Sequence, residues 1–207
     1  KMDSEPARTI EYKSIPHQPG VLHADIMHVT YDEGILDYLV GIDQQCAMTF
    51  AVQLKRSEND NVAKAIGAIK RCYQRHGHSL QHVHFDNEPA INSEETKTEI
   101  HTGGTDTIFH TPGRHVRRAE NVIKLIKRTY KAILVGLDYP CPYKLYPYAI
   151  RWAVQAINLT SKSGNALLSP WTIFTKEKLD FQKHFMAKFG DVVITRANSN
   201  DDVRSLN

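Results

Sequence analysis

The sequence predicts an α/β domain whose sheet combines antiparallel and parallel strand pairs. Three apolar runs follow one another near the start of the chain, with breaks short enough for hairpins. Two further strand-like runs come later, each after a segment with helical spacing of its apolar residues. The order βββαβαβαα joins hairpins to crossover connections, and this combination is typical of a mixed sheet covered by helices.

The first three strands are expected at residues 21–30, 36–44 and 47–54, which are rich in Val, Ile, Leu, Tyr and Phe. The breaks between them contain few residues, so the three strands should pair in antiparallel fashion. A helix should follow from about Glu58 to Gln74, with Ser57 as its N-cap, because its apolar residues recur at helical spacing.

The second half of the chain alternates helices and strands. A strand is expected at 81–86, a polar helix near 92–101 and a short strand at 107–109. A long amphipathic helix should span about 115–135, and a further helix about 144–160. The apolar residues of the long helix step by three and four and predict a buried stripe: Val116, Ala119, Ile123, Ile126, Tyr130 and Ile133.

Length and composition predict one domain with two less regular ends. The chain has 207 residues and is 41% apolar, which supports a single core at 21–160. Residues 1–20 are polar and contain three prolines, so we interpret them as a linker or extended arm. Residues 161–207 show little periodic pattern and are interpreted as a weakly structured C-terminal extension of the core.

Several functional classes are disfavoured by composition. Mean hydropathy is −0.43, and no run of 18 apolar residues occurs, so no membrane partner is expected. The N-terminus lacks the apolar core of a signal peptide. Three well-separated cysteines without a CxxC pair predict reduced thiols in the cytosol or nucleus, with neither a disulfide framework nor a zinc site.

Three carboxylates occur in the settings that two-metal phosphoryl-transfer chemistry requires. Asp25 lies within one strand-like run, Asp86 ends another, and Glu120 lies in the first turns of the long helix. Mg²⁺ binds oxygen ligands, and a pair of ions can activate an attacking hydroxyl and stabilise a leaving oxygen. The three side chains therefore predict an enzyme that acts on nucleic acid with two Mg²⁺ or Mn²⁺ ions.

Basic residues gather around Glu120. Residues 114–131 carry seven Lys or Arg and one acid, a local charge of +6 against +3 for the whole chain. At about 100° per residue, Lys124, Lys127 and Lys131 fall within about 40° of Glu120 on the helix. A DNA strand over this face would relieve the charge repulsion between metal ions and ammonium groups. The expected DNA contacts are Arg114, Arg117, Arg118, Lys124, Lys127 and Lys131.

Together these segments resemble the catalytic core of retroviral-type integrases, specifically those of Ty1/copia-class LTR retrotransposons. The resemblance covers about residues 20–190. Its segments are Leu22–Asp25, Tyr38–Asp43 with the family's non-catalytic Asp, His84–Glu88, Thr111–Asn121, Ser169–Lys176 and Phe189-Gly190.

The resemblance implies an RNase H-like fold, a five-stranded mixed sheet flanked by helices. Asp25, Asp86 and Glu120 would then be the metal-binding triad for 3′-end processing and for strand transfer of element DNA ends into target DNA. A homodimer or higher oligomer is implied, in the nucleus after a cytoplasmic virus-like-particle stage. The family's His/His/Cys/Cys zinc domain is absent from this sequence, so we expect a fragment of a larger polyprotein or an excised core.

Two departures keep an alternative open. Glu88 replaces the family's usual Gly, and the loop before Glu120 is unusually basic at residues 113–118. A non-catalytic or domesticated integrase-derived module that dimerises and binds DNA or protein is therefore the second hypothesis. An RNase H is a weaker third option because no clear fourth carboxylate is seen. His82 and His84 share a strand face and could bind a transition metal, although surface or loop histidines account for them as well.

Overall fold

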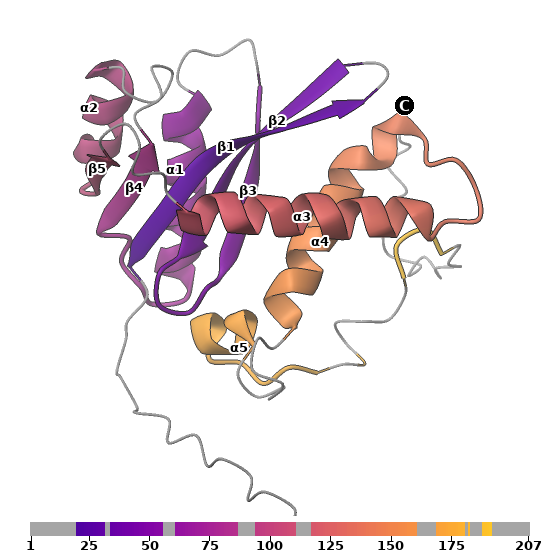
Figure 1. Ribbon diagram of the computed structural model, residues 1–207. Helices are drawn as coiled ribbons and strands as arrows, with labels where there is room; N and C mark the ends of the chain where they lie inside the picture. Colours follow the sequence, from indigo (N-terminus) through magenta and orange to yellow (C-terminus); the bar gives the residue numbers. More distant parts are fainter. Residues whose placement is uncertain are drawn as a thin grey trace, which may run out of the picture.

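A five-stranded mixed sheet forms the centre of the domain (Figure 1). The computed structural model describes residues 20–31, 34–55, 61–86, 94–110, 117–160, 169–180, 182 and 188–191. The strands are β1 (Val21–Tyr31), β2 (Gly34–Asp43), β3 (Thr49–Leu54), β4 (His82–Asp86) and β5 (Asp106–His110). Their order is β3-β2-β1-β4-β5; β1 to β3 pair antiparallel, and β4 and β5 run parallel to β1. The predicted mixed α/β class is confirmed.

Helices cover both faces of the sheet (Figure 1). They are α1 (Asn61–Arg75), α2 (Glu94–Thr102), α3 (Arg117–Val135), α4 (Tyr146–Leu159) and α5 (Pro170–Thr175), with a 3₁₀ turn, η1 (Tyr143–Leu145), leading into α4. One core lies between the sheet and α1, with contributions from α2 and α5. The other lies between the sheet and the pair α3 and α4. Among the described helices, none has the length and apolar content needed to cross a bilayer.

The central strand β1 contributes to both cores. Leu22 and Ala24 are fully buried on the α1 side, whereas Met27 and Val29 are buried on the α3 side. Successive side chains of a strand point to opposite faces, so a strand covered on both faces needs apolar residues at consecutive positions. This explains why the strand has apolar residues in both alternate sets of positions, between which polar residues such as His23 and Asp25 occur.

The start of one strand and the composition of one helical stripe differ from the prediction. β3 begins at Thr49 and not at 47, because residues 44–46 form a turn held by the Asp43 carboxylate. Val122 belongs to the buried stripe of α3 although the prediction omitted it. Ser57, Glu58 and Val116, which the predictions used for two helix starts, lie outside the described residues.

Part of the segment predicted to be weakly structured forms a helix, α5, which packs into the core. The Ser169 hydroxyl caps this helix by accepting the Thr172 backbone N–H at 3.1 Å. Phe174 is fully buried, and its ring meets the rings of Phe50 and Tyr73 edge-on. A helix of six residues is too short to show a period in the sequence, so only the tertiary contacts reveal it.

We expect the cap of α5 to contribute measurably to stability. Ser169→Ala should lower the free energy of unfolding by about 1 kcal/mol, because the Thr172 N–H loses its acceptor. Urea denaturation at neutral pH measures the difference. Thr160→Ala, at the end of α4, is a matched control that removes an exposed hydroxyl, which donates to the Ala156 carbonyl. Equal stability of Ser169→Ala and the wild type would contradict the assignment of the cap.

The three cysteines are free thiols, as predicted. Cys46 is buried and donates its S–H to Asp43 Oδ1 at 3.2 Å. Burial, and then the charge of Asp43, raise the pKa of this thiol well above its usual range. Because the thiolate is the reactive form, Cys46 should resist alkylation at pH 8 until the protein unfolds. Mass spectrometry after native and denaturing alkylation tests this, and rapid native labelling of Cys46 would contradict it.

Candidate active site

Asp25 lies near the middle of β1, on the face of the sheet that α3 covers. Its alternate neighbour Met27 is buried in the core beneath α3 and α4, and residues two apart on a strand share a face. Asp25 is half-buried, and its Oδ1 accepts the backbone N–H of Ile26 at 2.8 Å. The residues directly before and after Asp25, Ala24 and Ile26, face the other core, the one beneath α1.

The pairing of β1 with β4 brings positions 25 and 86 together. The two strands are parallel, and the last pair in register is Ala24 with Phe85. Asp25 comes one residue after Ala24, and Asp86 one residue after Phe85. Neighbouring strands are about 4.8 Å apart, so these two positions are adjacent across the sheet.

The stacked rings of His23 and His84 show that positions 25 and 86 belong to the same face of the sheet. The two rings pair directly in register, with centroids 4.7 Å apart and planes 24° apart. Asp25 and Asp86 are each two residues further along the same strands, in the same alternate set of positions. The structure describes the backbone of Asp86, which closes β4 opposite His110, and not its side chain.

Glu120 lies in the first turn of α3, the helix that packs over this face. Its side chain is 34% exposed, and one carboxylate oxygen lies 3.9 Å from Lys124 Nζ. Among the described side chains, no three His, Cys, Asp or Glu groups are arranged to hold a metal ion. Since the carboxylate of Asp86 is not among those side chains, the predicted metal triad stays a prediction.

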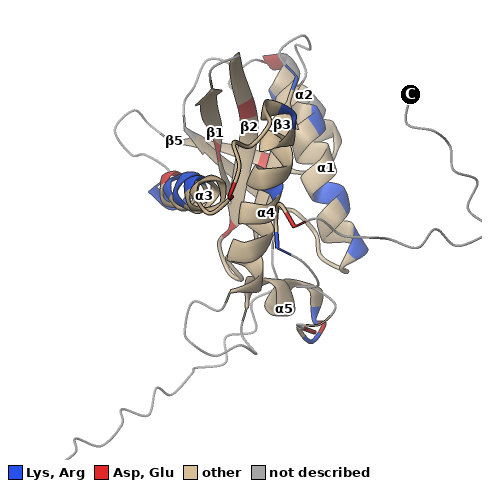
Figure 2. Cartoon of the chain, turned by 90° about the vertical axis from the view of Figure 1, so that its right-hand side faces the viewer, with Lys and Arg blue, Asp and Glu red and all other residues tan. Residues whose placement is uncertain are grey.

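Lys and Arg residues lie on the side of α3 that faces away from the sheet, where the helix is blue in Figure 2 and is seen nearly end-on. Arg117, Lys124 and Lys131 are exposed, and Lys127 is partly exposed. The buried residues of the helix, Ala119, Val122, Ile126 and Tyr130, alternate with them at helical spacing. The predicted basic face is therefore present on this helix.

Two of the predicted DNA contacts stand apart from that row. Arg118 donates from Nη1 to the carbonyl oxygen of Gln44 at 2.8 Å and so ties α3 to the turn after β2. Arg114 lies outside the described residues, as do Glu88 and residues 113–116 of the loop 113–118 that distinguished this chain from the family pattern.

Asp43 forms a polar network beneath the other face of the sheet. It is 1% exposed, and its oxygens accept hydrogen bonds from Gly20 N–H at 3.1 Å, Cys46 N–H at 2.9 Å and the Tyr73 hydroxyl at 2.8 Å. The Gln45 N–H donates to it as well, at 2.8 Å. Asp43 therefore connects the start of β1, the turn after β2 and helix α1. An Asp at a strand end is a familiar turn signal, but the sequence did not predict the partner on α1.

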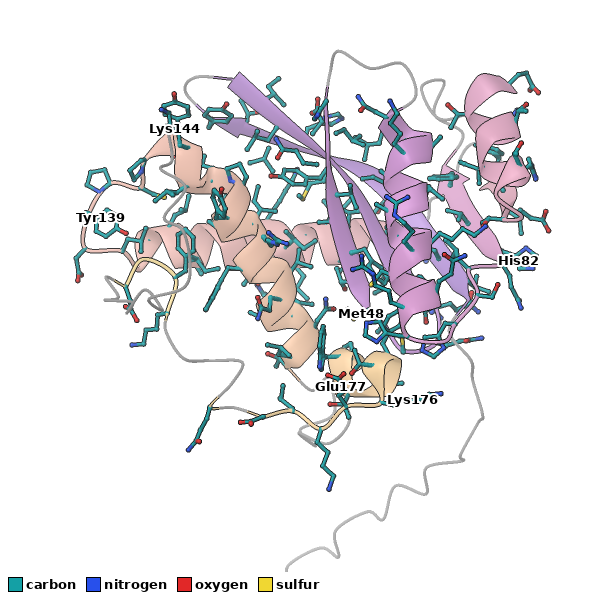
Figure 3. All side chains as sticks on the ribbon, turned by 180° about the vertical axis from the view of Figure 1, so that it is seen from behind. Met48, His82, Tyr139, Lys144, Lys176 and Glu177 are labelled. Atoms are coloured by element: carbon teal, nitrogen blue, oxygen red, sulfur yellow. The ribbon has the colours of Figure 1, made fainter. Side chains whose placement is uncertain are left out.

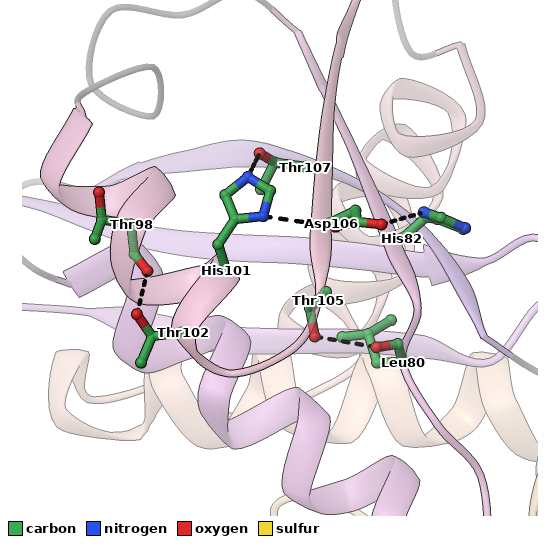
Figure 4. Close-up of polar contacts among 8 residues, drawn as sticks. All are labelled: Leu80, His82, Thr98, His101, Thr102, Thr105, Asp106 and Thr107. Atoms are coloured by element: carbon green, nitrogen blue, oxygen red, sulfur yellow. Dashed lines mark hydrogen bonds and ion pairs between the residues drawn. The ribbon is translucent and has the colours of Figure 1, made fainter.

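His82 and His84 have separate partners, although they share a strand face. His84 stacks on His23, whereas His82 Nδ1 lies 3.7 Å from Asp106 Oδ2. On the other side of Asp106, His101 Nδ1 is 3.6 Å from Oδ1, as Figure 4 shows. Both histidine side chains are about half exposed, at 40% and 48%. His82 thus lies beside the Asp106 carboxylate and His84 against the His23 ring, and among the described side chains no group of three metal ligands includes them.

Solved structures with a similar fold include catalytic cores of retroviral integrases. The HTLV-2 integrase catalytic core domain in complex with magnesium has a TM-score of 0.58 and 19% identity, over 76% of this chain and 97% of that one. The catalytic core domain of BIV integrase has a TM-score of 0.57 and 15% identity, over 76% of this chain and 95% of that one. A simian T-cell lymphotropic virus intasome, in complex with the PP2A regulatory subunit B56 gamma, has a TM-score of 0.60 and 16% identity, over 89% of this chain and 61% of that one.

These likenesses establish the fold. The chain has the integrase-like RNase H fold, with the five-stranded mixed sheet and flanking helices that the resemblance implied. No family model and no curated protein matches the sequence. The finer assignment to Ty1/copia-class elements is therefore a proposal.

Proposed function

We propose that this chain is the catalytic core of a retroelement integrase, a metal-dependent polynucleotidyl transferase that joins the 3′ ends of element DNA to target DNA. The observation that carries the proposal is the register of β1 and β4, which sets positions 25 and 86 side by side. The helix bearing Glu120 packs over the face on which Asp25 lies. The likeness in fold to integrase cores supports the same reading, and the Ty1/copia class rests on the sequence motifs.

Asp25, Asp86 and Glu120 are the proposed metal ligands. They supply only carboxylate oxygens, from two strands and a helix, and this rigid oxygen-rich set suits Mg²⁺ or Mn²⁺. The HTLV-2 core, whose fold is similar, is a complex with magnesium. Two bound ions would activate the attacking hydroxyl and stabilise the leaving oxygen of the phosphodiester.

The basic face of α3 is the proposed track for double-stranded DNA, both element ends and target. Lys124, Lys127 and Lys131 continue along the helix from Glu120, so phosphates bound to them would lead toward the carboxylates. Arg117 and Arg114 would add contacts at the start of the helix, and Arg118 would do so beside its bond to Gln44. We further propose action as a homodimer or higher oligomer, in the nucleus after a virus-like-particle stage.

The activity is tested with a branched DNA substrate in Mn²⁺ or Mg²⁺, on which an integrase core should catalyse disintegration, the reverse of strand transfer. Product formation that depends on the metal supports the proposal. DNA binding that persists in EDTA, with no product on any branched substrate, would instead support the non-catalytic binding module. The departure at Glu88 is the observation that keeps this second function in view.

The basic face makes a prediction about salt. Replacing Lys124 and Lys131 by Gln should reduce the slope of log K against log salt by about 0.9 for each phosphate that the variant no longer neutralises. Binding at low salt should weaken to a similar degree for unrelated duplex sequences, because phosphates carry no sequence information. Fluorescence anisotropy over a salt series measures the slope.

The matched control for the salt series is Lys178→Gln, which removes an exposed lysine after α5. This variant should keep the wild-type slope. An unchanged slope in the Lys124 and Lys131 double variant would show that the α3 face does not contact DNA phosphates.

A further inference from the structure

Arg118 ties the first turn of α3 to the turn that joins β2 and β3. Its Nη1 donates to the carbonyl oxygen of Gln44 at 2.8 Å, across a separation of 74 residues. Glu120 lies two residues after Arg118, in the same first turn of the helix. The end turns of helices fray because some of their backbone groups lack intrahelical partners. A side-chain bond from this turn to another part of the chain therefore restrains the residue that we propose as a metal ligand.

The acceptor of this bond belongs to a firmly held turn. The Gln44 backbone N–H donates to the Val21 carbonyl oxygen at 2.8 Å, which joins the turn to the start of β1. The next two backbone N–H groups, those of Gln45 and Cys46, donate to the Asp43 carboxylate at 2.8 and 2.9 Å. That carboxylate is buried, and satisfied buried networks are rigid. The Gln44 carbonyl is therefore a fixed point to which Arg118 attaches the helix.

The Gln44 side chain reaches the strand that carries Asp25. Its Oε1 lies 3.0 Å from His23 Nε2, at hydrogen-bond distance. The His23 ring stacks on the His84 ring of β4, and Asp25 follows His23 by two residues on the same face of β1. Gln44 thus contacts both the helix that bears Glu120 and the strand that bears Asp25.

We infer that Arg118 is a positioning residue, whose bond to Gln44 sets the position of Glu120 relative to Asp25. The inference rests on the proposed function, because it takes these carboxylates as metal ligands. Groups that orient metal ligands commonly change metal affinity by roughly 10- to 100-fold when they are replaced. This role differs from contact with a phosphate, which acts only when DNA is bound. The bond to Gln44 acts in the protein alone.

Mn²⁺ binding without DNA separates the two roles, and electron paramagnetic resonance of free Mn²⁺ measures it. Binding to the wild type should saturate, and Asp25→Asn should abolish it. Arg118→Gln should weaken binding at least about fivefold. Removing a positive charge would by itself strengthen the binding of a cation, so weaker binding indicates that position, and not charge, was lost. Wild-type or tighter binding in Arg118→Gln would overturn the inference.

The matched control is Arg128→Gln, which removes the same group from an exposed position ten residues further along α3. This variant should keep the wild-type affinity for Mn²⁺. Arg118 is itself exposed, so both variants should fold, and circular dichroism checks this. An equal loss of affinity in the two variants would assign the effect to the charge of the helix and overturn the inference.

A double variant shows whether Arg118 acts through Glu120. In Glu120→Gln the ligand is already lost, so adding Arg118→Gln should change Mn²⁺ affinity by less than about twofold, whereas independent effects would multiply. A further fivefold loss in that background would overturn the inference and leave the metal set intact. No saturable binding in the wild type, or wild-type binding in Asp25→Asn, would reject the proposed metal set itself, and the inference with it.

Discussion

Replacing Glu120 by Gln is expected to abolish strand joining while the domain stays folded. If Glu120 is a metal ligand, its loss removes several kcal/mol of transition-state stabilisation, and about 1.4 kcal/mol corresponds to a tenfold change in rate. We therefore expect a fall of at least about a thousandfold in disintegration of branched DNA. The fold should tolerate the change, because the Glu120 side chain is 34% exposed and glutamine keeps its size and shape.

The matched control is Glu177→Gln, which removes an exposed carboxylate just after α5 (Figure 3). It should leave activity within about twofold of wild type. Asp25→Asn should behave as Glu120→Gln does, since both residues belong to the proposed metal set. Wild-type rates in either variant, with the protein folded and the metal present, would remove these carboxylates from the proposed mechanism.

The second large effect is on stability. Asp43→Ala should lower the free energy of unfolding by roughly 3–5 kcal/mol, because it leaves several buried donors without an acceptor. Those donors include the Gly20 and Cys46 N–H groups and the Tyr73 hydroxyl. Domains of this kind are stable by only about 5–15 kcal/mol, so the variant should unfold at much lower urea. The measurement is urea denaturation at pH 7 by circular dichroism.

Tyr73→Phe measures the contribution of one hydrogen bond of the Asp43 network. It removes one donor to Asp43 and should cost about 1–2 kcal/mol, less than Asp43→Ala. In the double variant the two effects should be less than additive, because the residues share a hydrogen bond. A cost under about 1 kcal/mol for Asp43→Ala would show that the buried carboxylate contributes little to the fold.

The elements of the sheet could be predicted because their signals are local. β1 carries apolar residues on both of its faces, and α3 shows its 3.6-residue period over nineteen residues. The element α5 gave no such signal, since its six residues complete fewer than two turns. Its order comes from Phe174, whose burial against Phe50 and Tyr73 depends on segments more than a hundred residues away.

The candidate site, too, has features that local sequence predicts and features that depend on tertiary contacts. The sequence by itself determined which carboxylates lie on strands and which on a helix, because those settings follow from neighbouring residues. Only the tertiary structure decided that β4 runs parallel beside β1, so that Asp25 and Asp86 occupy adjacent positions. The tertiary structure also decided that Asp43 accepts a hydrogen bond from the Tyr73 hydroxyl. The physical reason is that local periodicity fixes the face on which a side chain lies. Which strand becomes its neighbour depends on the packing of the whole domain.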